Sequence, residues 1–242
     1  MKYVALIPAR LGSSRLPNKM MALLGGKPVI VQTALAVKAT ALFDDVIVVC
    51  DSDVIADAVQ AWGIKAIRST KEHASGTDRI AEAAASIDAD VFINVQGDEP
   101  FMQKQLLQQI IDVFENDAAA EVDIASPVRV ITEEADRSNP NVVKVVVDAK
   151  MNALYFSRAP IPYLRDADIK PTYYRHIGVY AFRKQTLLRF ATLAETPLEQ
   201  AEKLENLRML EHGMRIRMVL TDYTGIGIDT ADDLEKARLS LE

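Results

Sequence analysis

Short apolar segments alternate with amphipathic ones through the first half of this 242-residue chain. The apolar segments predict strands at residues 3–7, 46–50, 64–67 and 90–95. Helices are expected to open at Pro28, to run from about Asp53, as its cap, to Trp62 and from Thr77 or Asp78 to Ile87, and to span about 103–115. Such alternation with short links implies parallel strands joined by right-handed crossovers, with ligands at the carboxyl ends of the strands. The sequence therefore predicts an α/β fold, a mixed and mainly parallel sheet flanked by helices.

The second half of the chain has a different pattern. Segments 141–148 and 153–157 flank a short polar turn, which predicts an antiparallel hairpin. Further strands are expected at 173–182 and 216–220, and helices at 184–193, at 198–212 and from Asp229 onward. Neither a linker nor an internal repeat interrupts the chain. We therefore expect a single domain over residues 1–242, with an antiparallel elaboration at about 140–185.

The composition is typical of a globular protein with an ample core, since 49% of the residues are hydrophobic. No segment approaches the roughly 18 apolar residues that a membrane helix needs. Met1 and Lys2 lead straight into a strand without a small-residue cleavage site, which argues against a secretory signal. The lone cysteine, Cys50, cannot form an internal disulfide and is expected to be a small buried hydrophobic residue. These features predict a cytoplasmic protein without a membrane partner.

The first 43 residues contain six lysines and arginines and no acid, although the formal net charge of the chain is −6. Arg10, Arg15 and Lys19 lie in one loop after the first strand. Guanidinium forks, an ammonium and free backbone N–H groups suit a polyphosphate. A local basic loop in an acidic chain indicates a discrete anion site and not a nucleic-acid surface. The loop lacks the dinucleotide-binding and Walker glycine patterns. A solvated turn is the alternative, which the absence of any neighbouring acid disfavours.

Two carboxylates are candidates for a metal site. Asp98 follows an apolar strand and Gly97, so it is expected at the carboxyl edge of the sheet, where a hard oxygen ligand suits Mg²⁺. Asp98 and Glu99 could equally cap the following helix. Asp229 taken alone is better explained as a helix cap and becomes a metal candidate only when paired with Asp98. That pair, facing a cationic phosphate loop, describes nucleotidyl transfer with release of pyrophosphate.

Other patterns are weaker. Ser75 and its neighbours read as an ordinary capping sequence, and His176 alone is more typical of a structural histidine. Glu199, Glu202 and Glu205 share roughly one helical face, as solvated acids often do. No His/Cys cluster supports zinc, and no Ser–His–Asp arrangement can be argued. The Asp51-Ser52-Asp53 run could be the donor motif of a glycosyltransferase, but helix capping explains it better.

Seven segments in this order resemble one known family. They are Ile7-Pro8-Ala9-Arg10 with Ser13-Ser14-Arg15-Leu16-Pro17-Asn18-Lys19, Ser75-Gly76-Thr77-Asp78-Arg79, Asn94-Val95-Gln96-Gly97-Asp98-Glu99-Pro100, Asn139-Pro140-Asn141-Val142-Val143-Lys144-Val145, Tyr155-Phe156-Ser157-Arg158-Ala159-Pro160-Ile161-Pro162, Arg175-His176-Ile177-Gly178-Val179-Tyr180 and Gly227-Ile228-Asp229-Thr230. The similarity runs nearly end to end. The chain thus resembles the 3-deoxy-manno-octulosonate cytidylyltransferase (CMP-Kdo synthetase) family.

This resemblance implies a nucleotide-diphospho-sugar transferase, Rossmann-like fold and a homodimer built largely through the antiparallel elaboration. It implies transfer of CMP from CTP to 3-deoxy-D-manno-octulosonate (Kdo) for lipopolysaccharide synthesis, with Mg²⁺ as cofactor. The implied triphosphate residues are Arg10, Arg15 and Lys19; the cytosine and ribose residues are Ser75, Gly76, Arg79 and Gln96; the metal ligands are Asp98 and Asp229; and the sugar residues are Arg158, His176, Tyr180 and Glu205. Arg10, Lys19, Asp98 and Asp229 are the implied catalytic group.

Two positions depart from the family pattern on the expected sugar side. Tyr163 and Asn206 stand where relatives tend to have tryptophan and glutamine. These departures leave CTP as the nucleotide but keep other sugar acids open, namely 8-amino-Kdo or a sialic acid. A catalytically silent nucleotide-binding module is the alternative from another class, and it is disfavoured because both Asp98 and Asp229 are present.

Overall fold

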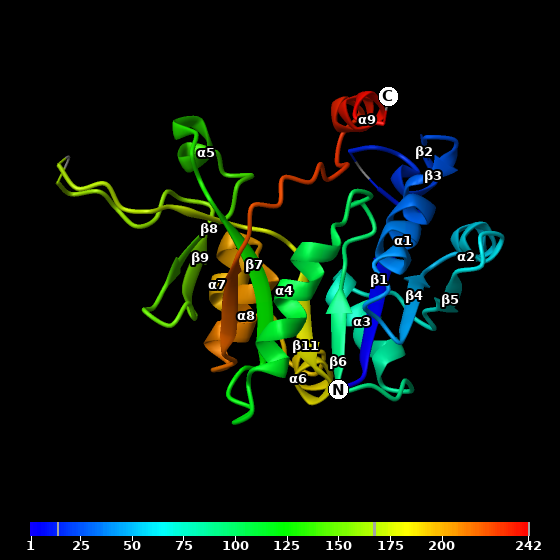
Figure 1. The fold of residues 1–242 in the computed structure, drawn as a ribbon, viewed down its shortest axis with the longest axis horizontal. Helices are drawn as coiled ribbons and strands as arrows, with labels where there is room; N and C mark the ends of the chain where they lie inside the picture. Colours follow the sequence, from blue (N-terminus) through cyan, green and yellow to red (C-terminus); the bar gives the residue numbers. More distant parts are fainter. Residues whose placement is uncertain (14, 167, 242) are drawn as a thin grey trace. The chain divides into compact units, whose positions relative to one another are not determined.

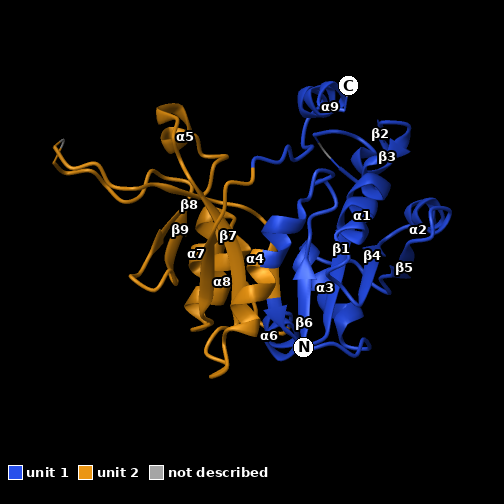
Figure 2. Ribbon diagram, in the orientation of Figure 1, with its two compact units in different colours: residues 1–108, 182–191, 224–242 blue, residues 109–181, 192–223 orange. Residues whose placement is uncertain are grey.

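A computed structural model describes residues 1–13, 15–166 and 168–241. Ser14 of the predicted anion loop lies outside these residues. The chain forms two compact units, coloured separately in Figure 2. Unit 1 comprises residues 1–108, 182–191 and 224–242, and unit 2 comprises 109–181 and 192–223. The chain passes from one unit to the other within α4 (Lys104–Glu115) and β11 (Tyr180–Arg183), among other places.

Unit 1 is built on a parallel sheet (Figure 1). Its strands lie in the order β5 (Lys65–Arg68), β4 (Asp45–Cys50), β1 (Tyr3–Ala9) and β6 (Val91–Asn94). The central strand β1 is buried at every position, because it pairs with a strand on each side: Val4 lies opposite both Asp45 and Phe92. The predicted parallel sheet of the first half is confirmed.

Helices cover both faces of this sheet. α1 (Val29–Ala39) and α2 (Asp53–Gln60) contact each other and β4, whereas α3 (Gly76–Ala84) and α6 (Lys184–Phe190) contact each other and β6. From β1 the chain steps outward to β4 and β5 and then returns to the other side as β6. Right-handed crossovers therefore place the two helix pairs on opposite faces. The expectation that Asp53 caps α2 is wrong, because the Ser52 hydroxyl accepts the capping bond from the Ile55 N–H at 3.3 Å.

A small corner of unit 1 joins its beginning to its end. It contains the 3₁₀ turn η1 (Lys19–Met21), the hairpin β2–β3 (Leu23–Leu24 and Lys27–Pro28) and the last helix, α9 (Ala231–Leu239). Leu24, Val29, Ile228, Leu234 and Ala237 form a buried apolar cluster there. Thr230, and not Asp229, is the N-cap of α9. Since α4 begins only at Lys104, Asp98 and Glu99 do not cap it either.

Among the described residues of unit 2, strands lie in the order β12 (Ile216–Leu220), β7 (Ile124–Val130), β10 (Tyr174–His176), β8 (Lys144–Val147) and β9 (Ala153–Ser157). β12 pairs with β7 in parallel, and the remaining neighbours are antiparallel. The predicted hairpin is confirmed as β8–β9, with a register shift between Val146 and Val147. A short helix, α5 (Glu134–Ser138), follows β7.

Two elements expected as continuous are divided. The strand expected at 173–182 is two strands, β10 and β11, separated by residues 177–179. The helix expected at 198–212 is two helices, α7 (Pro197–Glu202) and α8 (Glu205–Glu211). Lys203 between them has φ +54°, a left-handed conformation that ends a right-handed helix. Glu199 and Glu205 therefore lie on different helices, so the expected shared face is wrong.

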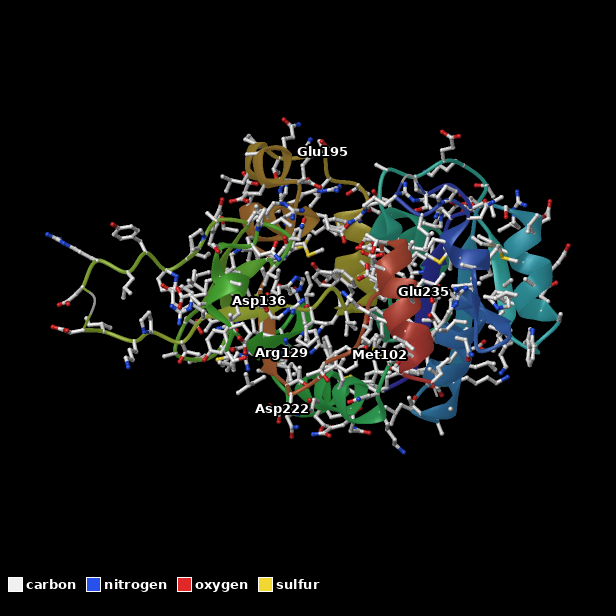
Figure 3. All side chains as sticks on the ribbon, turned by 90° about the horizontal axis from the view of Figure 1, so that it is seen from above. Met102, Arg129, Asp136, Glu195, Asp222 and Glu235 are labelled. Carbon is white, nitrogen blue, oxygen red and sulfur yellow. The ribbon has the colours of Figure 1, made fainter. Side chains whose placement is uncertain are left out.

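The segment between β9 and β10 contains no helix or strand at its described residues, 158–166 and 168–173. These described residues extend away from the strands of unit 2 as the two limbs of a long arm (Figure 1), and their side chains project outward along both limbs (Figure 3). Among the described residues, no helix is both long enough and apolar enough to span a membrane.

Candidate active site

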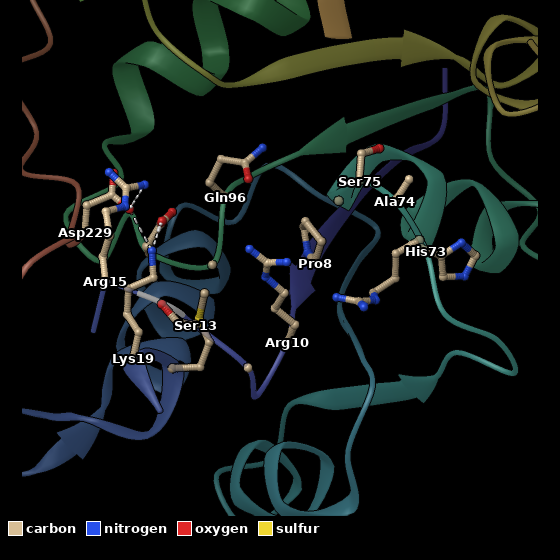
Figure 4. A pocket seen from close by; sticks show the side chains of 16 residues that line it. Pro8, Arg10, Ser13, Arg15, Lys19, His73, Ala74, Ser75, Gln96 and Asp229 are labelled. Atoms are coloured by element: carbon tan, nitrogen blue, oxygen red, sulfur yellow. Dashed lines mark hydrogen bonds and ion pairs between the residues drawn. The ribbon is translucent and has the colours of Figure 1, made fainter. Parts of the chain in front are cut away.

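A cleft of about 330 Å³ opens in unit 1 at the carboxyl ends of β1 and β6 (Figure 4). This is the edge at which parallel α/β sheets bind their ligands. The described residues that line it include every residue predicted for nucleotide and metal, namely Arg10, Arg15, Lys19, Ser75, Gly76, Arg79, Gln96, Asp98 and Asp229. The structure thus brings together residues from four separate segments of the sequence.

The floor of the cleft depends on a close approach between two strand ends. A Cβ on Gly97 would stand 2.9 Å from the Pro8 carbonyl oxygen, so this turn after β6 has no room for a side chain. The Thr33 hydroxyl in α1 donates to the Gly97 carbonyl at 2.8 Å and fixes the same turn from below. Because Gly97 packs this closely against Pro8, the next residue, Asp98, lies beside the end of β1.

Lys19 joins the two predicted metal ligands. Its ammonium lies 2.6 Å from Asp98 Oδ2 and 3.0 Å from Asp229 Oδ1, and its side chain is only 10% exposed. Burial works to lower the pKa of Lys19, but the two carboxylates outweigh it and raise the pKa above its ordinary value. Lys19 is therefore a fully charged ammonium at neutral pH, held between two acids.

Asp229 is brought to Asp98 by backbone contacts and packing. The Ile228 N–H donates to the Asp98 carbonyl at 2.9 Å, and the Ile228 side chain is completely buried in the cluster beneath α9. The Asp229 N–H in turn donates to Asp233 at 3.2 Å, within the first turn of that helix. The distance between the two carboxylates is thus set by hydrophobic packing at the end of the chain.

The Asp98–Lys19–Asp229 arrangement fits a hard divalent cation. Two carboxylate oxygens converge on the point occupied by the lysine ammonium, so the geometry already accommodates a positive charge there. Mg²⁺ is usually held by one or two carboxylates together with substrate phosphates and water. Within the described part of the chain, no group of three or more His, Cys, Asp or Glu could hold a metal ion. The protein thus supplies two ligands for an ion that would need a phosphate partner.

Cations dominate the rest of the cleft. Arg10, Arg15, Lys19 and Arg79 line it against the two carboxylates. Arg15 is exposed and pairs with Asp229 at 3.0 Å, whereas Arg79 is 6% exposed and donates to the Ala9 carbonyl at 2.9 Å. An excess of positive charge in a polar cleft favours a polyanionic ligand.

Ser75 has two roles in the structure. As the expected capping sequence indicated, its hydroxyl caps α3 by accepting from the Asp78 N–H at 3.1 Å. The residue also lines the cleft, so the first turn of α3 faces the ligand space. The N-terminus of a helix presents unpaired N–H groups and a partial positive charge, which suit polar or anionic ligand groups.

His73, for which the sequence indicated no function, also lines the cleft (Figure 4). Its Nε2 lies 2.5 Å from Glu82 Oε2, and Glu82 accepts from the Thr70 N–H and hydroxyl as well. Burial works to raise the pKa of Glu82, but the hydrogen bonds from Thr70 and His73 prevail and lower it to about 2. The pair fixes the turn before Ser75. A histidine two residues ahead of a cap carries no sequence signal for this role.

Three of the predicted sugar residues lie together in unit 2. The His176 and Tyr180 rings are 5.2 Å apart between centroids, and His176 also contacts Phe156 edge-on at 5.1 Å. His176 Nε2 is 2.8 Å from the Ser126 hydroxyl, and burial lowers the pKa of His176 to about 3. Burial raises the pKa of Tyr180 well above its ordinary value, and the nearby Glu205 raises it further. His176 is therefore a neutral imidazole at pH 7.

Arg158, the fourth predicted sugar residue, is engaged by backbone carbonyls. Its guanidinium donates to the carbonyls of Glu202 at 2.7 Å, Pro140 at 2.9 Å and Lys203 at 3.4 Å. The Glu202 carboxylate also binds the end of β9, since it accepts hydrogen bonds from the Ser157 hydroxyl and the Arg158 N–H. In this arrangement Arg158 ties the β9 end to the α7–α8 junction, next to Glu205.

Comparison with known proteins decides the family. A model of the cytidylyltransferase family matches residues 4–216. A 3-deoxy-manno-octulosonate cytidylyltransferase from Flavobacterium johnsoniae is 56% identical over 241 residues, covering 100% of this chain and 99% of its own length. The chain belongs to the 3-deoxy-manno-octulosonate cytidylyltransferase family. A member from Geobacter sulfurreducens is 41% identical over 247 residues, covering 98% of each chain.

Solved structures agree with this family membership. A CMP:2-keto-3-deoxy-manno-octonic acid synthetase complexed with CTP matches with a TM-score of 0.94 and 41% identity, covering 100% of this chain and 98% of its own. A 4-diphosphocytidyl-2C-methyl-D-erythritol synthase from Anaerococcus prevotii, only 16% identical, shares the fold with a TM-score of 0.65. The nucleotide-diphospho-sugar transferase fold expected for the 3-deoxy-manno-octulosonate cytidylyltransferase family is thereby confirmed.

Proposed function

We propose that this enzyme transfers CMP from CTP to 3-deoxy-D-manno-octulosonate (Kdo), giving CMP-Kdo and pyrophosphate, the reaction that activates Kdo for lipopolysaccharide synthesis. The observation that carries the proposal is the convergence of Asp98 and Asp229 on one cationic position within a cleft rich in arginine. Full-length relatives at 41–56% identity carry the name of this activity. A relative that is itself complexed with CTP has the same fold.

The nucleotide is expected to lie in the unit 1 cleft. Arg10, Arg15 and Lys19 would bind the triphosphate, because guanidinium groups and an ammonium offset its charge of about −4. The cytosine and ribose would lie along the turn at the start of α3, against Ser75, Gly76, Arg79 and Gln96. The anomeric hydroxyl of the sugar would attack the α-phosphorus in line. The α-phosphorus bond to the bridging oxygen breaks, pyrophosphate leaves and the hydroxyl proton is released.

Mg²⁺ would be held by Asp98 and Asp229 together with phosphate oxygens. When bound, this ion would neutralise charge developing on the phosphates and lower the pKa of a coordinated hydroxyl. The chain's own contribution is positional: the carboxylates are fixed by Gly97 and Ile228, and the cations of the loop hold the phosphates still. Positioning and electrostatics are the main catalytic effects expected for such a transfer.

The sugar acid would be recognised by Arg158, His176, Tyr180 and Glu205 of unit 2. An arginine can grip the carboxylate of the sugar through two parallel hydrogen bonds. The carbonyl contacts of Arg158 would then have to be exchanged in part for that carboxylate. His176 is neutral and hydrogen-bonded to Ser126, so it is suited to contact a sugar hydroxyl and not to pair with an acid.

A pyrophosphate-release assay with a panel of nucleotides and sugar acids tests the proposal. We expect turnover with CTP and Kdo in the presence of Mg²⁺, and much less with ATP, GTP or UTP. Faster turnover with 8-amino-Kdo or sialic acid would show that this sugar acid, and not Kdo, is the preferred acceptor of the CMP group, while the transfer reaction stays the same. Binding of CTP without pyrophosphate release from any acceptor would contradict the proposal and favour a silent nucleotide-binding module.

We also propose that the enzyme acts as a cytoplasmic homodimer. The arm of unit 2 exposes large apolar side chains, with Tyr163 87% and Ile169 60% exposed, and Leu164 lies between them. Apolar side chains gathered on one exposed segment favour association with another protein surface. We propose that a second copy of this chain covers the arm. Light scattering during size-exclusion chromatography should give twice the chain mass of 26.7 kDa. A monomer at micromolar concentration would contradict this assembly.

A further inference from the structure

Asp51 is an acid beside the cationic loop that the proposed reaction does not use. It follows β4 directly, and its Oδ1 accepts a hydrogen bond from the Leu11 N–H at 3.0 Å. Its Oδ2 lies 3.7 Å from the Arg79 guanidinium. Its neighbours have separate roles, since Ser52 caps α2 and Asp53 pairs with Arg68 at 2.6 Å. Within Asp51-Ser52-Asp53, Asp51 thus contacts the cationic loop, whereas Ser52 and Asp53 contact α2 and Arg68.

Arg79 contacts both Asp51 and the backbone just before the cationic loop. Its guanidinium is buried and donates to the Ala9 carbonyl at 2.9 Å. Its Nε is buried without a hydrogen-bond partner among the described residues, so the charge of this group is incompletely satisfied. A buried cation needs a nearby anion to offset its desolvation. Asp51 supplies that charge and binds the loop at the same time.

The two contacts flank a single residue. Arg79 holds the carbonyl of Ala9 and Asp51 holds the N–H of Leu11, and Arg10 lies between them. The Arg10 guanidinium is exposed, lines the cleft and makes no hydrogen bond or ion pair with any residue that the structure describes. Figure 4 shows Arg10 beside Pro8 at the end of β1. The backbone of Arg10 is therefore fixed on both sides while its guanidinium remains available to a ligand.

We propose that Asp51 is a positioning residue which, with Arg79, fixes the backbone around Arg10 and so directs its guanidinium to the nucleotide phosphates. This inference rests on the proposed function. A carboxylate close to a polyphosphate site repels the ligand, and this cost is offset when the carboxylate also orders a group that binds the phosphates. Arginine loses several rotamers on binding, so fixing its backbone in advance lowers the entropic cost of nucleotide binding.

Single variants at adjacent acids test the proposal. Asp51→Ala removes both the acceptor and the charge, and we expect its KM for CTP to rise about tenfold with kcat nearly unchanged, because one charge-assisted hydrogen bond is lost. Asp51→Asn keeps an oxygen for the Leu11 N–H and should recover most of the loss. Asp53→Ala is the matched control, since Asp53 is exposed and pairs with Arg68, and neither residue lines the cleft; it should behave as the wild type.

A double-mutant cycle shows whether Asp51 acts through Arg10. If it does, Asp51→Ala should have little further effect on CTP affinity, measured by calorimetry, in an Arg10→Ala background. An undiminished effect there would overturn the proposal, as would wild-type CTP affinity in Asp51→Ala.

Amide exchange of Leu11 in the nucleotide-free protein reports the contact independently of activity. We expect faster exchange in Asp51→Ala and wild-type exchange in Asp53→Ala; equal rates in the two variants would overturn the proposal. Absence of pyrophosphate release by the wild type would defeat the proposed function instead, while CTP affinity and Leu11 exchange would still decide the role of Asp51.

Discussion

The Lys19 ammonium pairs with two carboxylates at the position proposed for a metal ion. Its ammonium is 2.6 Å from Asp98 and 3.0 Å from Asp229, so a divalent cation between these acids must share or displace it. A bound triphosphate offers Lys19 new anionic partners. Nucleotide and metal should therefore help each other to bind, and coupling of this kind is reciprocal.

Lys19→Met is expected to change two affinities in opposite directions. Without the competing ammonium, the affinity for Mn²⁺ in the absence of nucleotide should rise severalfold, as measured by electron paramagnetic resonance. The KM for CTP should rise about tenfold, because a buried phosphate partner is lost. Lys27→Met, at a lysine outside the cleft, is the control. Unchanged Mn²⁺ affinity and unchanged KM would contradict this role for Lys19.

Asp98→Asn and Asp229→Asn should each lower kcat by about 100-fold or more at saturating Mg²⁺, because an amide is a poor ligand for a hard cation. Circular dichroism and the melting temperature should confirm that both variants remain folded. Asp232→Asn, in the first turn of α9 and outside the cleft lining, is the control and should keep near-normal turnover. Near-normal kcat in either of the first two variants would rule out that carboxylate as a metal ligand.

Among the elements, the turn after β6 is the tightest constraint on the site. Gly97→Ala would place a methyl group 2.9 Å from the Pro8 carbonyl oxygen, a contact that only a backbone shift can relieve. We expect a loss of about 1–3 kcal/mol in the free energy of unfolding, together with reduced activity, because Asp98 moves with the turn. Gly12→Ala is the matched control, since nothing lies within 4 Å of its added Cβ. Denaturant titration of the two variants measures the difference; equal stability would contradict the close approach.

The parallel half of the fold could be predicted from the sequence because each element carries its own local signal. In this half β1 and β4 were predicted to within two residues at either end; in unit 2, β12 was predicted at the observed residues. The division between α7 and α8 could not be predicted, because Lys203 gives no local sign of its left-handed conformation. No prediction covered β7, where Pro127 argues against a strand.

The candidate site could be predicted where its residues follow strand ends. Lys19 and Asp98 were singled out by charge and by position after apolar segments, whereas Asp229 became a metal candidate only through its pairing with Asp98. The structure places Lys19 in contact with both carboxylates. The parts that act through tertiary contacts could not be foreseen. Asp51 looked like part of a capping sequence, and His73 gave no sign of its bond to Glu82.

For the whole molecule, His176 should contribute to a loss of stability on mild acidification. Burial lowers its pKa to about 3, whereas an unfolded histidine titrates near 6.5. Above pH 6.5 neither state is protonated and the full stability is present. As the pH falls from 6.5 toward 3, the unfolded state takes up a proton that the folded state does not, costing up to about 1.4 kcal/mol per pH unit.

A melting-temperature series from pH 7.5 to 4 in wild type and His176→Gln isolates this effect. The wild-type melting temperature should fall more steeply below pH 6.5 than that of the variant, which lacks the titrating group. His212→Gln, at the exposed end of α8, is the control and should follow the wild type. Parallel curves for wild type and His176→Gln would show that His176 is accessible to protonation in the folded protein.

The contact between Lys19 and Asp229 joins residues 210 positions apart, and the packing that holds Asp229 comes from α9. During synthesis the cationic loop therefore leaves the ribosome 210 residues before the second carboxylate does. A nascent chain would therefore carry the cationic loop without the group that completes the centre. Transfer activity would begin only after α9 has emerged from the ribosome and packed, so nascent chains that still lack this helix would not turn over CTP.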